Sequence, residues 1–391
     1  MEEAIPALVC PVIVAPVSQD QWSGPQYAPP RGAPQGSPPY GRYGSTAPSG
    51  WQSIQTGGYY QNYPSSRFGH QSFGGGVPQY APRPAMPAPH RRSPLRMLFG
   101  VMIIIGLIAL AGFAITGLNS GSSNAAYQND EYRVPAPDRN PPPLPVPQTY
   151  GEAEQWITDS TFYAQTVPAP VRCNSQPINV STASDAQLES HFEGLMECLV
   201  RVWEMPITNA KFVIVRPTVT IYGEELTTKC GTTGINAFYC SADQQVYYSR
   251  YLPQALPVGK SKWTADIVMA HEFGHALQGR TGILISANAL GQESGEKRTE
   301  LQYMRRLETQ ADCFSGMFIR SVSESMGVQQ QDLDGILQIY VAIGDDELSG
   351  QPNIVGNHGL GRSRRYWGQM GLANTEVGKC NTFVAPSNLV R

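Results

Sequence analysis

The chain has 391 residues, with 28 Lys and Arg against 31 Asp and Glu, and its formal net charge at pH 7 is −3. Residues 1–96 carry seven Arg and three acidic residues, whereas residues 119–391 carry 21 basic and 28 acidic residues. Neither part has the excess of positive charge that marks a nucleic-acid-binding protein, so we expect no nucleic-acid partner.

The first 96 residues have the composition of a disordered segment. Of the 33 prolines, 24 precede residue 150, and residues 1–96 are also rich in Gly, Gln, Ser and Tyr. Such a sequence buries too little apolar surface to offset the entropy cost of ordering the chain. We predict a disordered tail at residues 1–96, which acts as a spacer or recruits protein partners.

Residues 97–118 form an uncharged apolar run, MLFGVMIIIGLIALAGFAITGL. A helix needs about 20 apolar residues to cross a bilayer, and the proline-rich flanks leave no domain in which this run would be a buried core helix. We therefore predict a transmembrane helix with the lipid bilayer as its partner. Because Arg91, Arg92 and Arg96 precede the run, the positive-inside rule places the N-terminus in the cytoplasm and everything after residue 118 outside.

After this run we expect a proline-rich stalk at residues 119–150 and one globular domain at residues 151–391. Residues 185–203 place apolar side chains at helical spacing, which predicts a helix. Residues 211–222 and 245–249 are rich in β-branched and aromatic residues, which predicts strands. The domain is therefore expected to be α+β, and an edge strand of its small sheet could pair with an extended peptide.

Cysteine usage agrees with an extracytoplasmic domain. Cys10 would lie inside the cell, whereas the other six cysteines would lie in the oxidising space outside. An even number of cysteines there predicts disulfides rather than free buried thiols. No C-x-x-C pair indicates a zinc site built from cysteines. Among the fifteen pairings that six cysteines allow, Cys230 and Cys240 flank a Gly-Thr-Thr-Gly turn and could close a hairpin. The disulfide candidates are Cys173, Cys198, Cys230, Cys240, Cys313 and Cys380.

Two histidines stand one helical turn apart within residues 265–278, where apolar residues recur at helical spacing. Residues four apart lie above one another on a helix, so His271 and His275 would hold a metal between them. Glu272 leans away from the metal but stays near its bound water. Since Zn²⁺ lowers the pKa of such a water to roughly 7, we predict one Zn²⁺ ion and Glu272 as general base. The alternative is a chance pattern in which both histidines are hydrogen-bonded core residues.

Catalytic zinc usually has three protein ligands. One known arrangement requires Gly and His where this chain has Gln278 and Thr281, which excludes it. A carboxylate from a later helix remains, and we predict Glu308 as the third ligand. Asp312, one helical turn on, could accept the free N–H of a ligand histidine and fix its tautomer. The competing carboxylates, which no aspartate follows four residues on, are Glu293, Glu296 and Glu300.

Two further interpretations concern Glu308 with Asp312 and, separately, His191. Glu308 and Asp312 could instead form a solvated acidic face beside Arg305 and Arg306. His191, in the helix predicted at residues 185–203, is expected to be a surface or packing residue rather than a ligand.

Several stretches together resemble the predicted neutral zinc metallopeptidases of bacteria, and they span most of residues 160–385. By this resemblance the fold would be zincin-like, with the glutamate ligand of the gluzincins, and the activity would be hydrolysis of peptide bonds. The matching stretches are FYCSADQQVY at 238–247, HEFGH at 271–275, ETQADC at 308–313, AIGDD at 342–346, HG at 358–359 and CNTF at 380–383.

The stretch after His358-Gly359 departs from the family pattern, which usually continues with Thr-Ser and a basic-aromatic segment. Here the chain continues as LGRSRRYW, up to Trp367. His358 is nevertheless the candidate for stabilising the developing oxyanion, with Tyr366 behind it. The alternative is that His358 has a structural role in its loop.

The sequence thus predicts a single-pass membrane protein whose extracytoplasmic domain is an α+β, zincin-like zinc peptidase, with its active-site helix packed on a small sheet and further helices. The substrate would be a peptide or protein outside the membrane. A first alternative is a non-catalytic binding or scaffold domain that retains a metal site, although such a site has no use for a base at Glu272. A second alternative is a hydrolase of a non-peptide amide in the cell envelope.

Overall fold

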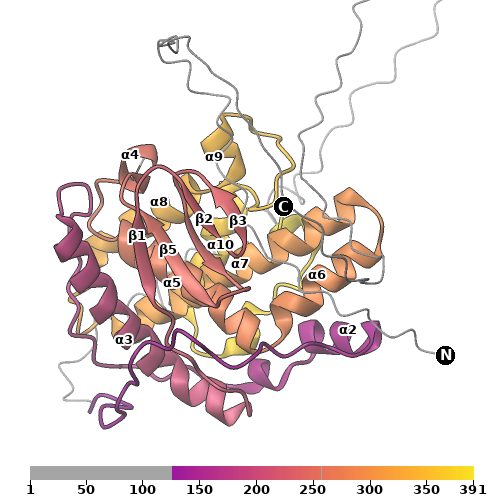
Figure 1. The fold of residues 1–391 in the computed structure, drawn as a ribbon, viewed down its shortest axis with the longest axis horizontal. Coiled ribbons are helices and arrows are strands. Elements are labelled where there is room, and N and C mark those ends of the chain that lie inside the picture. The colour runs from indigo at the N-terminus through magenta and orange to yellow at the C-terminus, as the bar shows by residue number, and fades with distance from the viewer. Residues whose placement is uncertain (1–125, 257) are drawn as a thin grey trace, which may run out of the picture. The chain divides into compact units, whose positions relative to one another are not determined.

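The computed structural model describes residues 126–256 and 258–391 (Figure 1). The predicted disordered tail at residues 1–96, the predicted transmembrane helix at residues 97–118 and Cys10 lie outside the described residues. The α+β class of the domain agrees with the structure, which combines long helices with two small sheets.

The membrane part of the prediction is corrected. None of the helices in residues 126–256 and 258–391 is long and apolar enough to cross a membrane. The two longest, α3 (Asp185–Asn209) and α7 (Lys297–Val322), have 25 and 26 residues, but both carry several charged side chains. A crossing needs about 20 predominantly apolar residues. The structure therefore does not support a single-pass membrane protein, nor the extracytoplasmic location inferred from it.

The five strands of the described residues follow one another in the chain, between α3 and the next α-helix. The other α-helices are α2 (Tyr150–Thr158), α4 (Leu252–Ala255), α5 (Thr264–Arg280), α6 (Ile283–Glu293), α8 (Gln330–Ala342), α9 (Asp345–Ser349) and α10 (Gly361–Ala373). The 3₁₀ helices are η2 (Thr161–Ala164), η3 (Val377–Cys380) and η4 (Ser387–Leu389). The strands are β1 (Val219–Tyr222), β2 (Leu226–Thr228), β3 (Gly231–Thr233), β4 (Ala237–Cys240) and β5 (Gln245–Ser249).

The sheet next to the candidate site has the strand order β1-β5-β4. β5 pairs antiparallel with β4, as a hairpin, and parallel with β1. β2 and β3 form a separate antiparallel ribbon. The strand predicted at residues 211–222 is confirmed only for its last four residues, since the register with β5 begins at Val219 and residues 211–218 are not part of a strand.

α5 carries the His271–His275 motif, and its 17 residues are all buried. It contacts both β4 and α7, and α7 in turn packs along α10; Figure 1 shows the sheet overlapping these helices. The close approach of α5 to α7 requires a small residue: a Cβ at Gly274 would lie 3.0 Å from the Cα of Ala311. Gly371 of α10 likewise lies against the backbone of Cys313. Glycine at these two contacts therefore brings three helices to one point.

Three disulfides link the domain, which confirms the prediction of oxidised cysteines. They join Cys173 to Cys198, Cys230 to Cys240 and Cys313 to Cys380. The Cys230–Cys240 pair agrees with the expected local bridge, although the residues between the two cysteines form β3 rather than only a turn.

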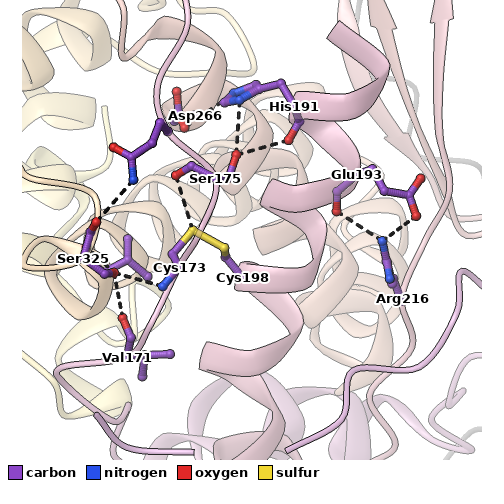
Figure 2. Close-up of a disulfide and its surroundings, with 11 residues drawn as sticks. Val171, Cys173, Ser175, His191, Glu193, Cys198, Arg216, Asp266 and Ser325 are labelled. Atoms are coloured by element: carbon purple, nitrogen blue, oxygen red, sulfur yellow. Dashed lines mark hydrogen bonds and ion pairs between the residues drawn. A yellow bond between two sulfur atoms is a disulfide. The ribbon is translucent and has the colours of Figure 1, made fainter. Parts of the chain in front are cut away.

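The Cys173–Cys198 disulfide ties an extended segment to α3, as Figure 2 shows. The same segment is held by Ser325, whose hydroxyl accepts the N–H of Cys173 at 2.9 Å. His191, on α3, is buried with its Nδ1 3.2 Å from the hydroxyl of Ser175 and its Nε2 3.6 Å from Asp266. His191 therefore lies in the packing between α3 and the start of α5.

The proline-rich residues 126–149 contact the rest of the domain. Arg201 donates to the backbone carbonyls of residues 129, 130 and 132, at 3.2, 3.0 and 2.8 Å. Arg280, at the end of α5, donates to the carbonyl of Pro142 at 2.8 Å. Prolines cannot donate from the backbone, but their carbonyls remain available as acceptors.

Candidate metal centre

The two histidines of α5 face the same side of the helix because they are separated by four residues. Their ring centroids lie 4.8 Å apart and the rings are nearly perpendicular. Both side chains are almost fully buried, at 6% and 2% exposure. Buried imidazoles need partners for both nitrogens.

α7 brings a carboxylate to these imidazoles. Glu308 Oε2 lies 3.3 Å from His271 Nε2, and Glu308 Oε1 lies 3.4 Å from His275 Nε2. Four-coordinate zinc holds nitrogen and oxygen ligands at about 2.0–2.1 Å in tetrahedral geometry, which separates the ligand atoms by about 3.3 Å. The distances from each imidazole to the nearer oxygen of Glu308 are thus of the size expected between ligand atoms of one zinc ion.

Unsatisfied polar atoms support the same interpretation. His275 Nε2 and Glu308 Oε2 are buried and make no hydrogen bond with the described part of the chain. Together with His271 they form a group of potential ligand atoms that lie within 4.8 Å of one another. A buried polar atom without a partner is costly, so a cation between these atoms would satisfy them.

The other imidazole nitrogens are bonded away from this point. His271 Nδ1 lies 2.9 Å from Asp312 Oδ1, and His275 Nδ1 lies 2.8 Å from Gln278 Oε1. Because a carboxylate and an amide oxygen only accept, each Nδ1 carries a proton, and Nε2 is the nitrogen left to bind a metal. Neutral histidine in this tautomer is the form that binds a metal.

Gln278 was not predicted as a site residue. Its amide nitrogen donates to the carbonyl of Leu307 at 2.8 Å and to Gln310 at 3.1 Å, which fixes the amide oxygen toward His275. The signal in the sequence was its position three residues after His275, on the same helical face.

The electrostatics of the centre favour a bound cation. Burial opposes the ionisation of Glu308, but His275 and His271, with His358 at longer range, lower the pKa of Glu308 well below its usual value. Burial also opposes the protonation of His271, but Asp312 and Glu308 outweigh it and raise the pKa of His271 to about 9. The carboxylates therefore stabilise positive charge at this point, either as a proton on His271 or as a metal ion in its place.

Glu272 lies beside the cluster but is not one of its three potential ligands. Its Oε2 accepts the backbone N–H of Tyr239, on β4, at 2.9 Å. Burial raises the pKa of Glu272, against the lowering effect of the two histidines. A strand N–H thus holds in place a carboxyl group that binds protons more readily than an exposed one.

Asp312 is fully buried and contacts a cation that sequence reasoning did not single out. Arg364, on α10, donates from Nε to Asp312 Oδ2 and from Nη2 to Asp312 Oδ1, both at 2.9 Å. Arg305 and Arg306 are also buried and donate to backbone carbonyls. The alternative of a solvated acidic face on α7 is therefore excluded. The three competing carboxylates lie at the junction of α6 and α7 and are outside the cluster: Glu293, Glu296 and Glu300.

His358 lies in the loop before α10 and is also outside the three-residue cluster. Its Nδ1 is 3.0 Å from Asp345 Oδ1, while Asp345 Oδ2 accepts the N–H groups of His358 and Gly359 at 3.1 and 2.8 Å. Asp345 therefore fixes both the ring and the backbone of His358. Tyr366 packs edge-on against Trp367 at 5.3 Å.

Comparison with known proteins identifies the family. The sequence profile of the family described as "Putative neutral zinc metallopeptidase" matches residues 149–383. A protein of Escherichia coli strain K12, named uncharacterized protein YpfJ, is 31% identical over 181 residues, which cover 43% of this chain and 62% of that protein. Uncharacterized protein Rv2575 of Mycobacterium tuberculosis strain H37Rv is 30% identical over 193 residues, covering 44% of this chain and 63% of its own length. The chain thus matches less than two thirds of either relative, and no solved structure matches it.

Proposed function

Because the chain belongs to the neutral zinc metallopeptidase family, we propose that it hydrolyses peptide bonds with one zinc ion held by His271, His275 and Glu308. The two Nε2 atoms and the carboxylate of Glu308 would be the protein ligands. Bound zinc supplies a Lewis acid that polarises the scissile carbonyl and lowers the pKa of a water molecule to about 7.

Glu272 is proposed as the general base. Its carboxylate is adjacent to the ligands but is held by the N–H of Tyr239 rather than by the histidines. It would accept a proton from the attacking water and pass it to the leaving amine. A carboxyl group whose pKa is raised toward neutrality does both more readily, because proton transfer is most efficient when the pKa is near the working pH.

Asp312 and Gln278 are proposed to orient the ligands. Each accepts the Nδ1 proton of one histidine, so each directs an Nε2 lone pair to the common point. His358 is proposed to stabilise the developing oxyanion. The support for this role is that Asp345 anchors the ring of His358 and that the charge of His358 helps to lower the pKa of Glu308.

The observation that carries the proposal is that the Nε2 atoms of two histidines lie 3.3 and 3.4 Å from the two oxygens of the Glu308 carboxylate, with the separate carboxylate of Glu272 beside them. A site that only stabilises the fold would be expected to have four protein ligands. Three protein ligands, with Glu272 outside the ligand set, would instead leave the fourth position on the zinc ion open for a reacting group.

The test compares the purified wild-type chain with Glu272→Gln, using zinc analysis and cleavage of a peptide library. We expect about one zinc per chain in both proteins, and at least a 100-fold loss of cleavage in the variant, since general base catalysis contributes about 10²–10⁴-fold. Exposed Glu189→Gln on α3 is the control and should cleave like the wild type.

Two results would contradict the proposal. Zinc bound without cleavage in the wild type would favour a binding domain, and absence of zinc would remove the metal centre altogether. Cleavage of non-peptide amides without cleavage of any peptide would assign a different substrate class to the same residues.

A further inference from the structure

Arg364 has the most extensive set of buried polar contacts near the metal centre. Its guanidinium meets Asp312 side-on, through Nε and Nη2 at 2.9 Å each, and its Nη1 donates to the carbonyl of Ile343 at 2.9 Å. Its side chain is 3% exposed and that of Asp312 is 0% exposed. We propose that Arg364 is a positioning residue of the metal centre, which holds Asp312 so that Asp312 can orient His271; this inference rests on the proposed metal site.

Arg364 and Asp312 together surround His271 Nδ1. Asp312 Oδ1 is shared, since it lies 2.9 Å from both Arg364 Nη2 and His271 Nδ1, and Arg364 Nη2 itself lies 3.3 Å from His271 Nδ1. A guanidinium can only donate, so Asp312 Oδ1, and not Arg364, is the acceptor for a proton on His271 Nδ1. Arg364 thus acts on the tautomer of His271 chiefly by fixing this acceptor.

Lysine could not reproduce this contact. Nε and Nη2 of Arg364 reach two different oxygens of Asp312 in one plane, and this holds the carboxylate against rotation. A lysine ammonium is a point charge that would leave Asp312 free to turn about its side-chain bonds. The orientation of Asp312, rather than only its charge, depends on the guanidinium.

The third contact connects Arg364 to the His358 loop. Ile343 ends α8 and is two residues from Asp345, the residue that holds His358. Arg364 therefore links the orienting group of a proposed ligand with the segment that orients His358. Loss of the Arg364 guanidinium should disturb the zinc site more than the segment around His358, because its contacts with Asp312 are between charged groups, whereas its contact with that segment is to a neutral carbonyl.

The experiment measures metal binding by the full chain carrying Arg364→Lys or Arg364→Gln. The zinc dissociation constant is measured by competition with a chelator, and the visible spectrum of the Co²⁺-loaded protein reports the ligand geometry. We expect 10–100-fold weaker zinc binding, the usual cost of losing a group that orients a metal ligand, together with an altered cobalt spectrum. Arg362→Lys, on the exposed side of the same helix, should change neither.

A purely structural role would give a different pattern. If Arg364→Lys lowers the melting temperature but leaves zinc affinity and the cobalt spectrum unchanged, the proposal is overturned. In an Asp312→Asn background, Arg364→Lys should weaken zinc binding less than it does in the wild type, because the charged contact with Asp312 is gone and only the contacts with His271 at 3.3 Å and Glu308 at 3.9 Å remain. An undiminished effect in that background contradicts the route. Absence of zinc binding in the wild type would instead refute the proposed function itself.

Discussion

At the scale of single residues, the centre depends on groups that hold the ligands as much as on the ligands. His271 is oriented by Asp312 and His275 by Gln278, one charged acceptor and one neutral acceptor. The charged pair is reinforced by Arg364, whereas Gln278 is fixed by the carbonyl of Leu307. The two histidines therefore have different environments, and we expect His271 to be the more basic ligand.

Replacing Gln278 with alanine tests the neutral half of this arrangement. The change leaves the Nδ1–H of His275 and the carbonyl of Leu307 without their partner in a fully buried position. We expect about 10-fold weaker zinc binding and a loss of about 1–3 kcal/mol in the free energy of unfolding. Chelator competition and urea denaturation measure the two effects. Gln338→Ala, at an exposed position of α8, serves as the control; unchanged zinc affinity in Gln278→Ala would show that His275 needs no orienting group.

At the scale of elements, the ligands meet because α5 and α7 approach closely. Gly274 lies between the two histidines in the sequence, and a Cβ there would lie 3.0 and 3.1 Å from the Cα and Cβ of Ala311. Ala311 lies on α7 between Glu308 and Asp312. The distance between these helices therefore sets the distance between the ligands.

Substituting Gly274 with alanine should separate the helices by a few tenths of an ångström. We expect the free energy of unfolding to fall by about 1–3 kcal/mol, as for other overpacked cores, and zinc binding to weaken because Glu308 moves away from both imidazoles. Gly335→Ala in α8 is the matched control, since a Cβ there meets nothing within 4 Å. That control should be neutral or stabilising by about 0.5–1 kcal/mol. Equal stability and zinc affinity in Gly274→Ala and wild type would contradict this account of the helix spacing.

At the scale of the whole molecule, the disulfides join segments that are distant in the sequence. Cys313 follows Asp312 on α7, and its partner Cys380 lies 67 residues further on, whereas Cys230 and Cys240 are 10 residues apart. A longer closed loop restricts the unfolded chain more strongly. The Cys313–Cys380 bridge should therefore contribute more to stability than the Cys230–Cys240 bridge.

Replacing each pair with alanine measures this difference. From loop closure alone, removal of Cys313–Cys380 should cost about 4 kcal/mol and removal of Cys230–Cys240 about 3 kcal/mol. Denaturant unfolding of the two double variants beside the wild type gives both values. A larger cost for the shorter loop would show that native contacts, rather than loop length, determine the effect.

The sequence predicted the local features of this molecule well. The helix with His271 and His275 follows from side-chain periodicity, and the strand at residues 245–249 follows from its β-branched and aromatic residues, both of which are local properties. The use of all six cysteines of residues 126–391 in disulfides also agrees with expectation.

Contacts between distant segments could not be predicted in this way. Arg364 lies 52 residues from Asp312, and no periodicity reports that α10 packs along α7. Proline-rich composition at residues 126–149 indicates extended backbone but does not say that Arg201 and Arg280 hold it to the domain. The helices α3 and α7 are long enough to cross a membrane, but their charged residues distinguish them from membrane spans. Helix length alone therefore does not identify a membrane span.

A crystal structure of the zinc-loaded protein tests the central claim most directly. The account predicts one zinc ion within about 2.0–2.2 Å of His271 Nε2, His275 Nε2 and a carboxylate oxygen of Glu308, with Glu272 close by but not bound to the ion. A zinc ion bound elsewhere, or a Glu308 carboxylate turned away from a zinc held by the two histidines, would contradict it.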